Sequence, residues 1–308
     1  ATTCLINSLT IPVVQSMQSQ ISETIIKSSM VGKTVVSYLA AALLFGMSPL
    51  GQAHAGTPND MKKQADDWQF IVGAAGGYFA DYEGSDDYDF TPLPLIGVSW
   101  RDTVSIGSVD GPPGLKVKFL KIKGPRPKDR LVLSTSLGYF GGRDQDDNDA
   151  LQGLGDLDGG VTIRLSADYQ IQDFGAGLSV GRDLSGDREG TTVNMGLKYS
   201  FALGSPKTQL TLGASTTWAD DSYMESIFGI STAQAASSTL GYAAFNSEAG
   251  FKDVGLDVSV RHFWSQNVMV MGKLGYKQLL SDAADSPIVD DQGNAAQFSA
   301  LIGVIYVW

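Results

Sequence analysis

The feature that most constrains the fold is an alternation of apolar and polar residues with a period of two. In residues 192–201 the apolar positions are Val193, Met195, Leu197, Tyr199 and Phe201. The same alternation recurs over 161–169, 208–218 and 254–261. A period of two is that of a β-strand whose two faces meet different surroundings. The chain therefore predicts a sheet built from such strands.

Twelve segments carry this alternation. They are 68–79, 89–99, 115–122, 131–140, 161–169, 173–181, 192–201, 208–218, 242–251, 254–261, 268–278 and 297–308. A short run at 103–108 is a thirteenth candidate. Single-chain bacterial barrels have even numbers of strands, so this run would require one more strand, for which Ile227–Ile230 is the candidate. We predict twelve strands, with fourteen as the reserve. No amphipathic helix of useful length is expected after residue 55.

Alternating strands build either soluble sandwiches, with the apolar face inward, or membrane barrels, with that face towards lipid. Segments of about 9–11 residues suit a tilted crossing of a bilayer. Aromatic residues gather at the segment ends, as in interfacial girdles; among them are Trp68, Trp100, Trp218, Trp264 and Trp308. Charged residues make up 18% of the chain, against about 25% in soluble domains. These features favour a closed antiparallel transmembrane β-barrel over a secreted β-sandwich.

The final segment, LIGVIYVW, carries an apolar residue at every second position. The residues that define this face are Phe298, Ile302, Val304, Tyr306 and Trp308. Such an ending resembles the signal by which the assembly machinery recognises bacterial outer-membrane barrels. We predict that this strand closes the barrel against the first one, so that no edge is left unpaired.

The N-terminal part resembles a targeting segment. Residues 30–55 combine Lys33 with an apolar run at 35–47, and Ala53 and Ala55 fit a cleavage site before Gly56. We therefore divide the chain into an upstream extension of open status (1–29), a signal peptide (30–55), a periplasmic segment (56–67) and an outer-membrane barrel (68–308).

Composition argues against several classes of function. The net charge is −11, and loss of Glu23, Lys27 and Lys33 with the leader makes it one unit more negative; nucleic-acid binding needs the opposite sign. The only cysteine, Cys4, precedes the predicted cleavage site, so no disulfide or cysteine-based metal site is expected. His262 stands beside two aromatic residues, where an interfacial role is expected. We predict no catalytic residue, no cofactor and no metal, and no nucleic-acid partner.

The acidic segment 144–159 is the one stretch that invites a calcium interpretation. Asp144, Asp146 and Asn148 fit the first, third and fifth positions of an EF-hand loop. Asp149 stands where that loop needs glycine and Gly155 where it needs glutamate. We expect a solvated acidic loop.

Several separated motifs resemble the MltA-interacting protein (MipA/OmpV) family. They are DYEGSDDY (81–88), PLPLIGVSW (92–100), WADDSYMESIFGIS (218–231), GFKDVGLDVSV (250–260) and LLSDAADSPIV (279–289). The resemblance covers about residues 68–308 and implies an outer-membrane protein of a Gram-negative bacterium, in contact with outer-membrane lipid. It also implies a scaffold that brings a murein hydrolase, a lytic transglycosylase, together with a murein synthase.

Three functions remain open from the sequence: this scaffold, a narrow solute channel, and a surface adhesin or receptor. A channel would be lined by side chains of mixed charge and so be weakly selective; the candidates are Arg164, Asp168, Lys198, Asp257, Arg261 and Lys273. The motif residues are either binding elements or loops that pack over the barrel mouth. They are Asp81, Tyr82, Glu83, Gly84, Trp218, Asp220, Asp221, Tyr223, Asp282, Asp285, Ser286 and Pro287.

Overall fold

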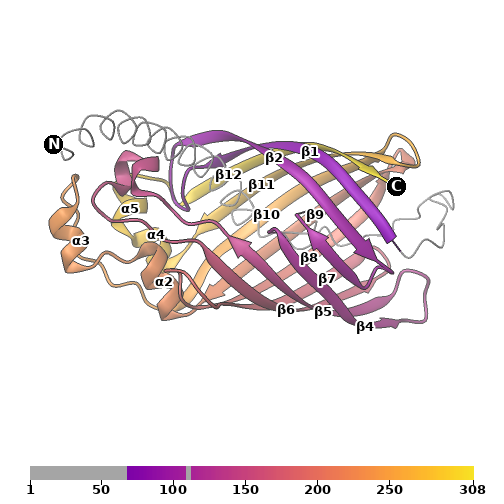
Figure 1. Cartoon of the computed structure of the whole chain (residues 1–308), viewed down its shortest axis with the longest axis horizontal. Coiled ribbons are helices and arrows are strands. Elements are labelled where there is room, and N and C mark those ends of the chain that lie inside the picture. The colour runs from indigo at the N-terminus through magenta and orange to yellow at the C-terminus, as the bar shows by residue number, and fades with distance from the viewer. Residues whose placement is uncertain (1–67, 109–111) are drawn as a thin grey trace, which may run out of the picture.

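The computed structural model describes residues 68–108 and 112–308, and in these residues the chain forms a closed barrel of twelve antiparallel strands (Figure 1). The strands are β1 (Trp68–Ala80), β2 (Tyr88–Trp100), β3 (Val104–Gly107), β4 (Gly114–Lys123), β5 (Arg130–Phe140), β6 (Gly160–Ile171), β7 (Phe174–Asp183), β8 (Thr191–Leu203), β9 (Ser205–Ala219), β10 (Gly250–Phe263), β11 (Val268–Leu279) and β12 (Ala296–Val307). Each strand pairs with its sequence neighbours, and β12 pairs with β1. The predicted fold class and closure are confirmed; the predictions for 1–29, 30–55 and 56–67 lie outside the described residues.

The apolar positions of the strands cover the outside of the barrel. On β8, Leu197 is 67% exposed and Met195 is also exposed. Lys198 and Ser200, at the alternate positions that follow, are shielded. Leu256, Leu274 and Ile302 are likewise more than 60% exposed on their strands. Large apolar side chains in such numbers would be unfavourable in water, so this outer surface fits the hydrocarbon of a bilayer.

Aromatic side chains form two groups at the ends of the strands. At the end that holds Trp308, its ring stacks on Phe70 with centroids 5.9 Å apart, and Phe174 lies 4.6 Å from Tyr199. At the other end, Tyr78 stacks on Tyr88 with centroids 5.4 Å apart. Amphipathic rings at two levels are typical of the membrane–water interfaces of barrels.

The strand count is right, but the predicted set of strands is wrong at two places. The short run 103–108 forms β3, whereas 242–251 forms no strand before Gly250. Phe245 makes only an isolated bridge with Ile230, and Tyr242 is buried among loops. The physical reason is that Tyr242 and Phe245 alternate locally but are shielded by other loops instead of lipid. Ile227 lies in a helix, so the reserve fourteenth strand does not form either.

Short helices lie in the loops at one end, contrary to the expectation of no useful helix. They are η1 (Gln145–Asp147), η2 (Asp149–Leu151), α2 (Asp221–Phe228), α3 (Thr232–Ser237), α4 (Ser281–Asp285) and α5 (Pro287–Asp290). In α2 the apolar residues Tyr223, Met224, Ile227 and Phe228 follow the spacing of one helical face, a signal that the search for longer helices missed. No helix in the described ranges has the length and apolar character needed to cross a membrane.

The two ends of the barrel differ in their connections. The long ones, at one end, are 81–87, 141–159, 184–190, 220–249 and 280–295; the short turns, at the other, are 101–103, 124–129, 172–173, 204 and 264–267. Figure 1 shows helices α2–α5 at one end and the C-terminus at the opposite end. Outer-membrane barrels have short periplasmic turns and longer extracellular loops. The helical end is therefore the external one.

Candidate functional site

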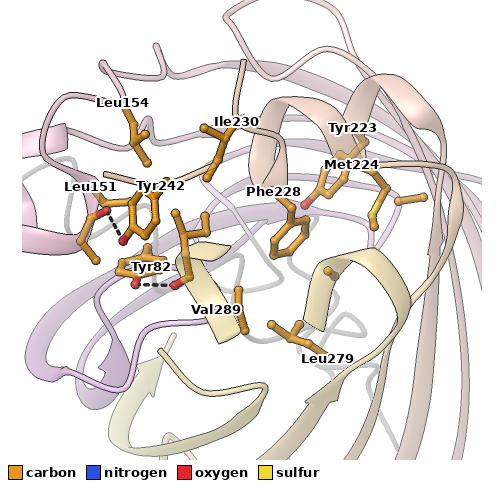
Figure 2. Close-up of a cluster of buried hydrophobic side chains, with 14 residues drawn as sticks. Tyr82, Leu151, Leu154, Tyr223, Met224, Phe228, Ile230, Tyr242, Leu279 and Val289 are labelled. Carbon is orange, nitrogen blue, oxygen red and sulfur yellow. Dashed lines mark hydrogen bonds between the residues drawn. The ribbon is translucent and has the colours of Figure 1, made fainter. Parts of the chain in front are cut away.

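The long loops pack into a cap that has its own hydrophobic core. We define the cap as the five long loops named above. Figure 2 shows side chains from four of these loops converging on one cluster. Met224, Phe228 and Ile230 are fully buried there, and Val289 and Leu151 are 1% exposed. Loops of a solvated rim do not bury such side chains, so the cap is a packed structure over the barrel mouth.

Hydrogen bonds between loops fix the cap in one arrangement. The Tyr82 hydroxyl donates to the Ile288 carbonyl oxygen (2.9 Å), and the Tyr242 hydroxyl donates to that of Ala150 (3.0 Å), both drawn in Figure 2. The Ser286 hydroxyl donates to the Phe228 carbonyl oxygen (2.6 Å). Burial raises the pKa of Tyr82, so the phenol stays a neutral donor.

Most of the motif residues build this cap. Asp220 caps α2 by accepting from the Tyr223 amide (3.0 Å), Asp221 accepts from Ala249 (2.6 Å) and Asp282 from Glu248 (2.7 Å). Their contacts support the packing interpretation of these loops. The remaining motif residues are placed as follows: Asp81, Tyr82, Glu83 and Gly84 in the first long loop, Trp218 near the end of β9, Tyr223 in α2, Asp285 exposed at the end of α4, Ser286 buried after it, and Pro287 at the start of α5.

Gly84 shows why its position needs a glycine. Its φ is +108°, in the region that side-chain-bearing residues rarely adopt. A Cβ there would lie 2.4 Å from Val289 Cγ2 of the cap core. The residue therefore lets the first loop approach the last one closely.

Beneath the cap, four charged side chains form a buried network that the sequence interpretation missed. Lys252 pairs with Glu83 and, at 2.9 Å, with Asp253; Lys277 lies 3.4 Å from Glu83 and 3.8 Å from Asp253. The Lys252 and Asp253 side chains are only 5% and 3% exposed. Burial alone would raise the pKa of Glu83, but Lys252 and Lys277 outweigh it and hold that pKa below its ordinary value. The network joins the first loop to β10 and β11.

A β-bulge in β10 makes the network possible. The pairing with β9 shifts register between Phe251 and Asp253, so Lys252 is the extra residue. Phe251 and Val254 remain exposed while Lys252 and Asp253 are both buried. The sequence signal for this bulge is a break in the alternation, because two consecutive charged residues, Lys252 and Asp253, stand between two apolar ones.

A second buried cation connects the wall to the cap. Arg188 Nε donates to Asp183 Oδ2 (3.0 Å), and its guanidinium carbon lies 3.7 Å from the centroid of the Phe140 ring. The same group lies 5.5 Å from the Tyr223 ring centroid in α2. Cation–π contacts of this kind are strongest where water is excluded. The 184–190 loop is thereby fixed against the wall and against α2 of the cap.

The predicted lumen residues lie on the shielded faces of their strands. Those residues are Arg164, Asp168, Lys198, Asp257, Arg261 and Lys273, and each is only partly exposed. Lys273 Nζ and Asp257 Oδ1 are 3.7 Å apart across β10 and β11, with side chains 21% and 27% exposed. Side chains on the inner face that keep this exposure indicate that the lumen is not packed solid at their level.

The inner surface also carries an apolar cluster. Leu95, Met271 and Ile305 form a buried cluster, with Ile71, Ala75, Met269, Leu301 and Val307 packed against it. These residues come from β1, β2, β11 and β12, which are neighbours in the barrel. A Cβ on Gly73 would lie 3.3 Å from Ile305 Cγ1, so this glycine allows Ile305 to lie flat on the wall. This cluster lies directly beside charged positions, because Arg261 pairs with Met271 and Lys273 pairs with Leu301.

The periplasmic end carries a basic hairpin, which we define as residues 116–130. It holds seven basic residues, Lys116, Lys118, Lys121, Lys123, Arg126, Lys128 and Arg130, and one acidic residue, Asp129. The 101–103 turn lies level with Lys118, whose amide donates to the Thr103 carbonyl oxygen, so residues 119–127 extend past this turn and are all exposed. Lys118 and Lys121 contact Asp102 (2.5 and 3.3 Å), and Lys128 contacts Asp173 (2.6 Å). These surface ion pairs are weak, so the lysines can bind other anions in place of Asp102 and Asp173.

The remaining chemical candidates have structural contacts. His262 Nδ1 lies 2.9 Å from the Thr208 hydroxyl, and its ring is 6.2 Å from that of Trp264. Asp144 and Asn148 accept from the amides of Asp146 (2.8 Å) and Ala150 (2.9 Å), which forms the two short helical turns of that loop. In the described ranges, no three His, Cys, Asp or Glu residues are grouped so as to hold a metal ion.

Comparisons with solved structures find outer-membrane proteins. OprB of Pseudomonas putida has a TM-score of 0.38 and 10% identity, over 79% of this chain and 94% of that one. OmpT of Vibrio cholerae, as expressed in the outer membrane, has a TM-score of 0.33 and 10% identity, over 79% and 97%. OprD of Pseudomonas aeruginosa has a TM-score of 0.34 and 13% identity, over 78% and 65%. No curated protein matches the sequence significantly.

The family comparison is extensive. The model described as MltA-interacting protein MipA matches residues 72–308, which include most of β1, the other eleven strands and the whole cap. The match begins within β1 and continues through the strand that closes the barrel. Together with the lipid-facing exterior, it places the protein in the outer membrane. The chain belongs to the MltA-interacting protein (MipA) family of outer-membrane β-barrels.

Proposed function

We propose that this barrel is a non-enzymatic scaffold that holds peptidoglycan-remodelling enzymes, a lytic transglycosylase and a murein synthase, at the inner face of the outer membrane. The observation that carries the proposal is the exposed basic hairpin at the periplasmic end. The family description, MltA-interacting protein, supplies the kind of partner. We infer that the barrel provides a docking surface and that the docked enzymes carry out the catalysis.

Charge and exposure make the hairpin suitable for a protein partner. Nine consecutive exposed residues, 119–127, combine Lys121, Lys123 and Arg126 with the apolar side chains of Phe119 and Ile122. Charge complementarity mainly sets partner choice and association rate. We therefore expect a partner whose contact surface is acidic.

The cap weighs against an axial solute channel. Side chains from four loops, including the fully buried Met224 and Phe228, fill a core across the external mouth. Opening a path along the barrel axis would expose this core to water, at a cost of about 1.5–3 kcal/mol for each large side chain.

A crosslinking pull-down tests the scaffold. The tagged barrel is crosslinked in intact envelopes and recovered, and murein enzymes are quantified by mass spectrometry. The wild type should enrich a transglycosylase, a synthase or both. The variant Lys121→Glu/Lys123→Glu/Arg126→Glu should reduce the enrichment of murein enzymes at least five-fold. Asp146→Lys/Asp147→Lys on the cap should leave this enrichment unchanged. Recovery of no murein enzyme by the wild type would refute the scaffold; equal recovery by the hairpin variant would place docking elsewhere.

A further inference from the structure

The basic hairpin, at the end of the barrel opposite the cap helices (Figure 1), carries an open strand edge. On the side of the 101–103 turn, β4 makes its last backbone contact where the Lys118 amide donates to the Thr103 carbonyl oxygen (2.8 Å). Beyond this bond, residues 119–123 have no strand partner on that side within the described ranges, whereas β5 pairs with their other side as far as Lys123. At about 3.3 Å per residue, the open edge is about 16 Å long.

The pairing with β5 determines which backbone groups face the open side. The Gly124 amide donates to the Asp129 carbonyl oxygen (2.8 Å) across the hairpin. In an antiparallel pair, the residues that exchange such bonds alternate along the strand, so Ile122 also turns its backbone groups towards β5. The N–H and C=O groups of Lys121 and Lys123 therefore point to the open side, where they offer two donors and two acceptors.

A β-bulge in β4 produces this arrangement. The register with β5 shifts between Lys118 and Leu120, so Phe119 is the extra residue. Without the extra residue, Leu120 would follow Lys118 in turning its backbone groups away from β5, and Lys121 would be bonded to β5. Because of the bulge, the open backbone groups belong to the lysines of this edge.

The two faces of the open edge differ in chemistry. Side chains alternate along a strand, so Lys121 and Lys123 share one face, and Leu120 and Ile122 share the other. All four are exposed, Ile122 at 50%. On the lysine face, Lys121 Nζ already lies 3.3 Å from Asp102 Oδ2, so a carboxylate fits beside this edge. The complementary strand is one that alternates acidic and apolar residues.

Charge argues against a second copy of the hairpin as the occupant of this edge. Pairing two hairpins edge to edge would bring the lysines of one close to those of the other, and like charges across a strand pair are destabilising. Edge lysines commonly protect sheets from such self-association. An acidic strand would instead gain from opposite charges across the pair. Residues 119–123 also contain no proline, so none of their N–H donors is missing.

We propose that residues 119–123 bind an extended acidic segment of a periplasmic protein by β-strand addition. The backbone groups of Lys121 and Lys123 hydrogen-bond to the added strand, whose acidic side chains face the two lysines and whose apolar side chains lie along Leu120 and Ile122. In this mode the backbone bonds give affinity and the alternate side chains give specificity. The inference deepens the proposed scaffold by naming how a partner docks, and it rests on that proposal for the partner's being a murein enzyme.

Hydrogen exchange tests whether a strand is added. The full barrel in phosphatidylcholine nanodiscs is mixed with a synthetic peptide of about nine residues that alternates Glu and Val, and exchange is read residue by residue by mass spectrometry. The amides of Lys121 and Lys123 should exchange at least ten-fold more slowly with the peptide, whereas Ile122, already bonded to β5, should change little. The same peptide with methylated backbone nitrogens should give no such protection. Absence of binding, or binding without protection of Lys121 and Lys123, would overturn strand addition.

Two variants at one position separate the backbone donor from the charge. Lys123→Pro removes the lysine charge and the N–H of the open edge, whereas Lys123→Ala removes the charge alone. Proline is tolerated on an edge strand where its nitrogen faces the unpaired side, and a mobility shift on unboiled gels confirms that both variants fold. Fluorescence anisotropy should show that Lys123→Pro binds the labelled peptide at least five-fold more weakly than Lys123→Ala. Equal affinities of two folded variants would overturn the proposal, and the exchange experiment decides it on the wild type if Lys123→Pro does not fold.

The same variants distinguish failure of the edge from failure of the scaffold. In the crosslinking pull-down, Lys123→Pro should recover at least five-fold less murein enzyme than Lys123→Ala. If the wild type recovers murein enzymes and the two variants recover equal amounts, the scaffold stands and strand addition is overturned. If the wild type recovers none while the peptide protects Lys121 and Lys123, the scaffold is refuted and the edge is supported as a site for acidic segments of another periplasmic protein.

Discussion

Lys252 shows at the scale of one residue how the cap is attached to the barrel. Its ammonium group is buried between Glu83 of the first loop and Asp253 of β10, and lies 5.8 Å from the Tyr223 ring centroid. Burying charges is costly, but removing one partner of a buried group is costlier, because the others remain without compensation. The attachment is therefore sensitive to the loss of any member.

Lys252→Met should loosen the cap by about 3 kcal/mol, the cost of leaving buried carboxylates without their cation. Hydrogen exchange of amides in 81–87 and 280–295 measures this loss directly. Lys121→Met, at a surface pair with Asp102, is the matched control and should change exchange by less than about 1 kcal/mol. Equal protection in wild type and Lys252→Met would show that the network does not hold the cap.

Acidification should release the same attachment. Lys252 and Lys277 hold the pKa of Glu83 below its ordinary value of 4.5. A carboxylate with a lowered pKa stabilises the folded state fully above its unfolded pKa, and this stabilisation is lost as the pH falls through the folded one. Protection of the cap amides should therefore be constant from pH 7 to 5 and fall below about 4.5. Glu83→Gln should be less protected at pH 7 and should lose the part of the pH dependence that Glu83 contributes; an unchanged profile would contradict this.

Among the elements, α2 is the main support of the cap core. Its residues Met224 and Phe228 are fully buried, yet the barrel strands are paired independently of it. Phe228→Ala should destabilise the cap by about 3–5 kcal/mol, from lost burial and the cavity left behind. Protease cleavage within 220–249 should accelerate while the barrel keeps its mobility shift on unboiled gels. Loss of that shift would show that cap and barrel fold as one unit.

β2 permits a second prediction about an element, because only Gly97–Trp100 pair with β3, whereas residues 88–95 have no strand partner on that side within the described ranges. Pro92→Val/Pro94→Val restores two N–H donors on an unpaired edge at membrane depth, where such donors seek a partner strand. We expect a dimer band on unboiled gels that the wild type does not give. Val98→Thr, at a position already paired with Ile106, is the control and should stay monomeric. A monomeric double variant of unchanged stability would mean that the edge is satisfied within the chain.

The elements also show what local sequence can and cannot reveal. β8 was predictable because Val193, Met195 and Leu197 face lipid at every second position over its whole length. β3 has four residues, too few for a periodic pattern, while Tyr242 and Phe245 imitate one inside the cap. Local alternation reports that a side chain leaves water, but not whether lipid or protein receives it. The contacts of Glu83 with Lys252 join residues 169 apart in the chain, which no local pattern encodes.

At the scale of the whole molecule, the alternating apolar face of the last strand predicted that the barrel closes. β12 pairs with β1 from Val307 at Ile71 to Ala300 at Tyr78, as its apolar face predicted. The role of Phe298, Ile302, Val304, Tyr306 and Trp308 in assembly stays a prediction. Tyr306→Ser/Trp308→Ser should lower the heat-modifiable fraction in the outer membrane several-fold, because the recognition face loses its aromatic end. A matched inward change, Ser299→Ala, should not, and equal assembly of both variants would exclude a signal at this end.

The two ends of the molecule have opposite character, and the proposed scaffold requires a particular orientation in the membrane. The cap is acidic and packed, whereas the hairpin of residues 116–130 is basic and is exposed over 119–127. A scaffold for murein enzymes works only if the hairpin lies in the periplasm, on the side of the short turns. In a Cys4→Ser background, a membrane-impermeant maleimide on intact cells should label Thr232→Cys in α3 and not Lys123→Cys. Both should react once the outer membrane is permeabilised. Labelling of Lys123→Cys alone on intact cells would show that the barrel is inserted the other way round, with the hairpin out of reach of any periplasmic partner.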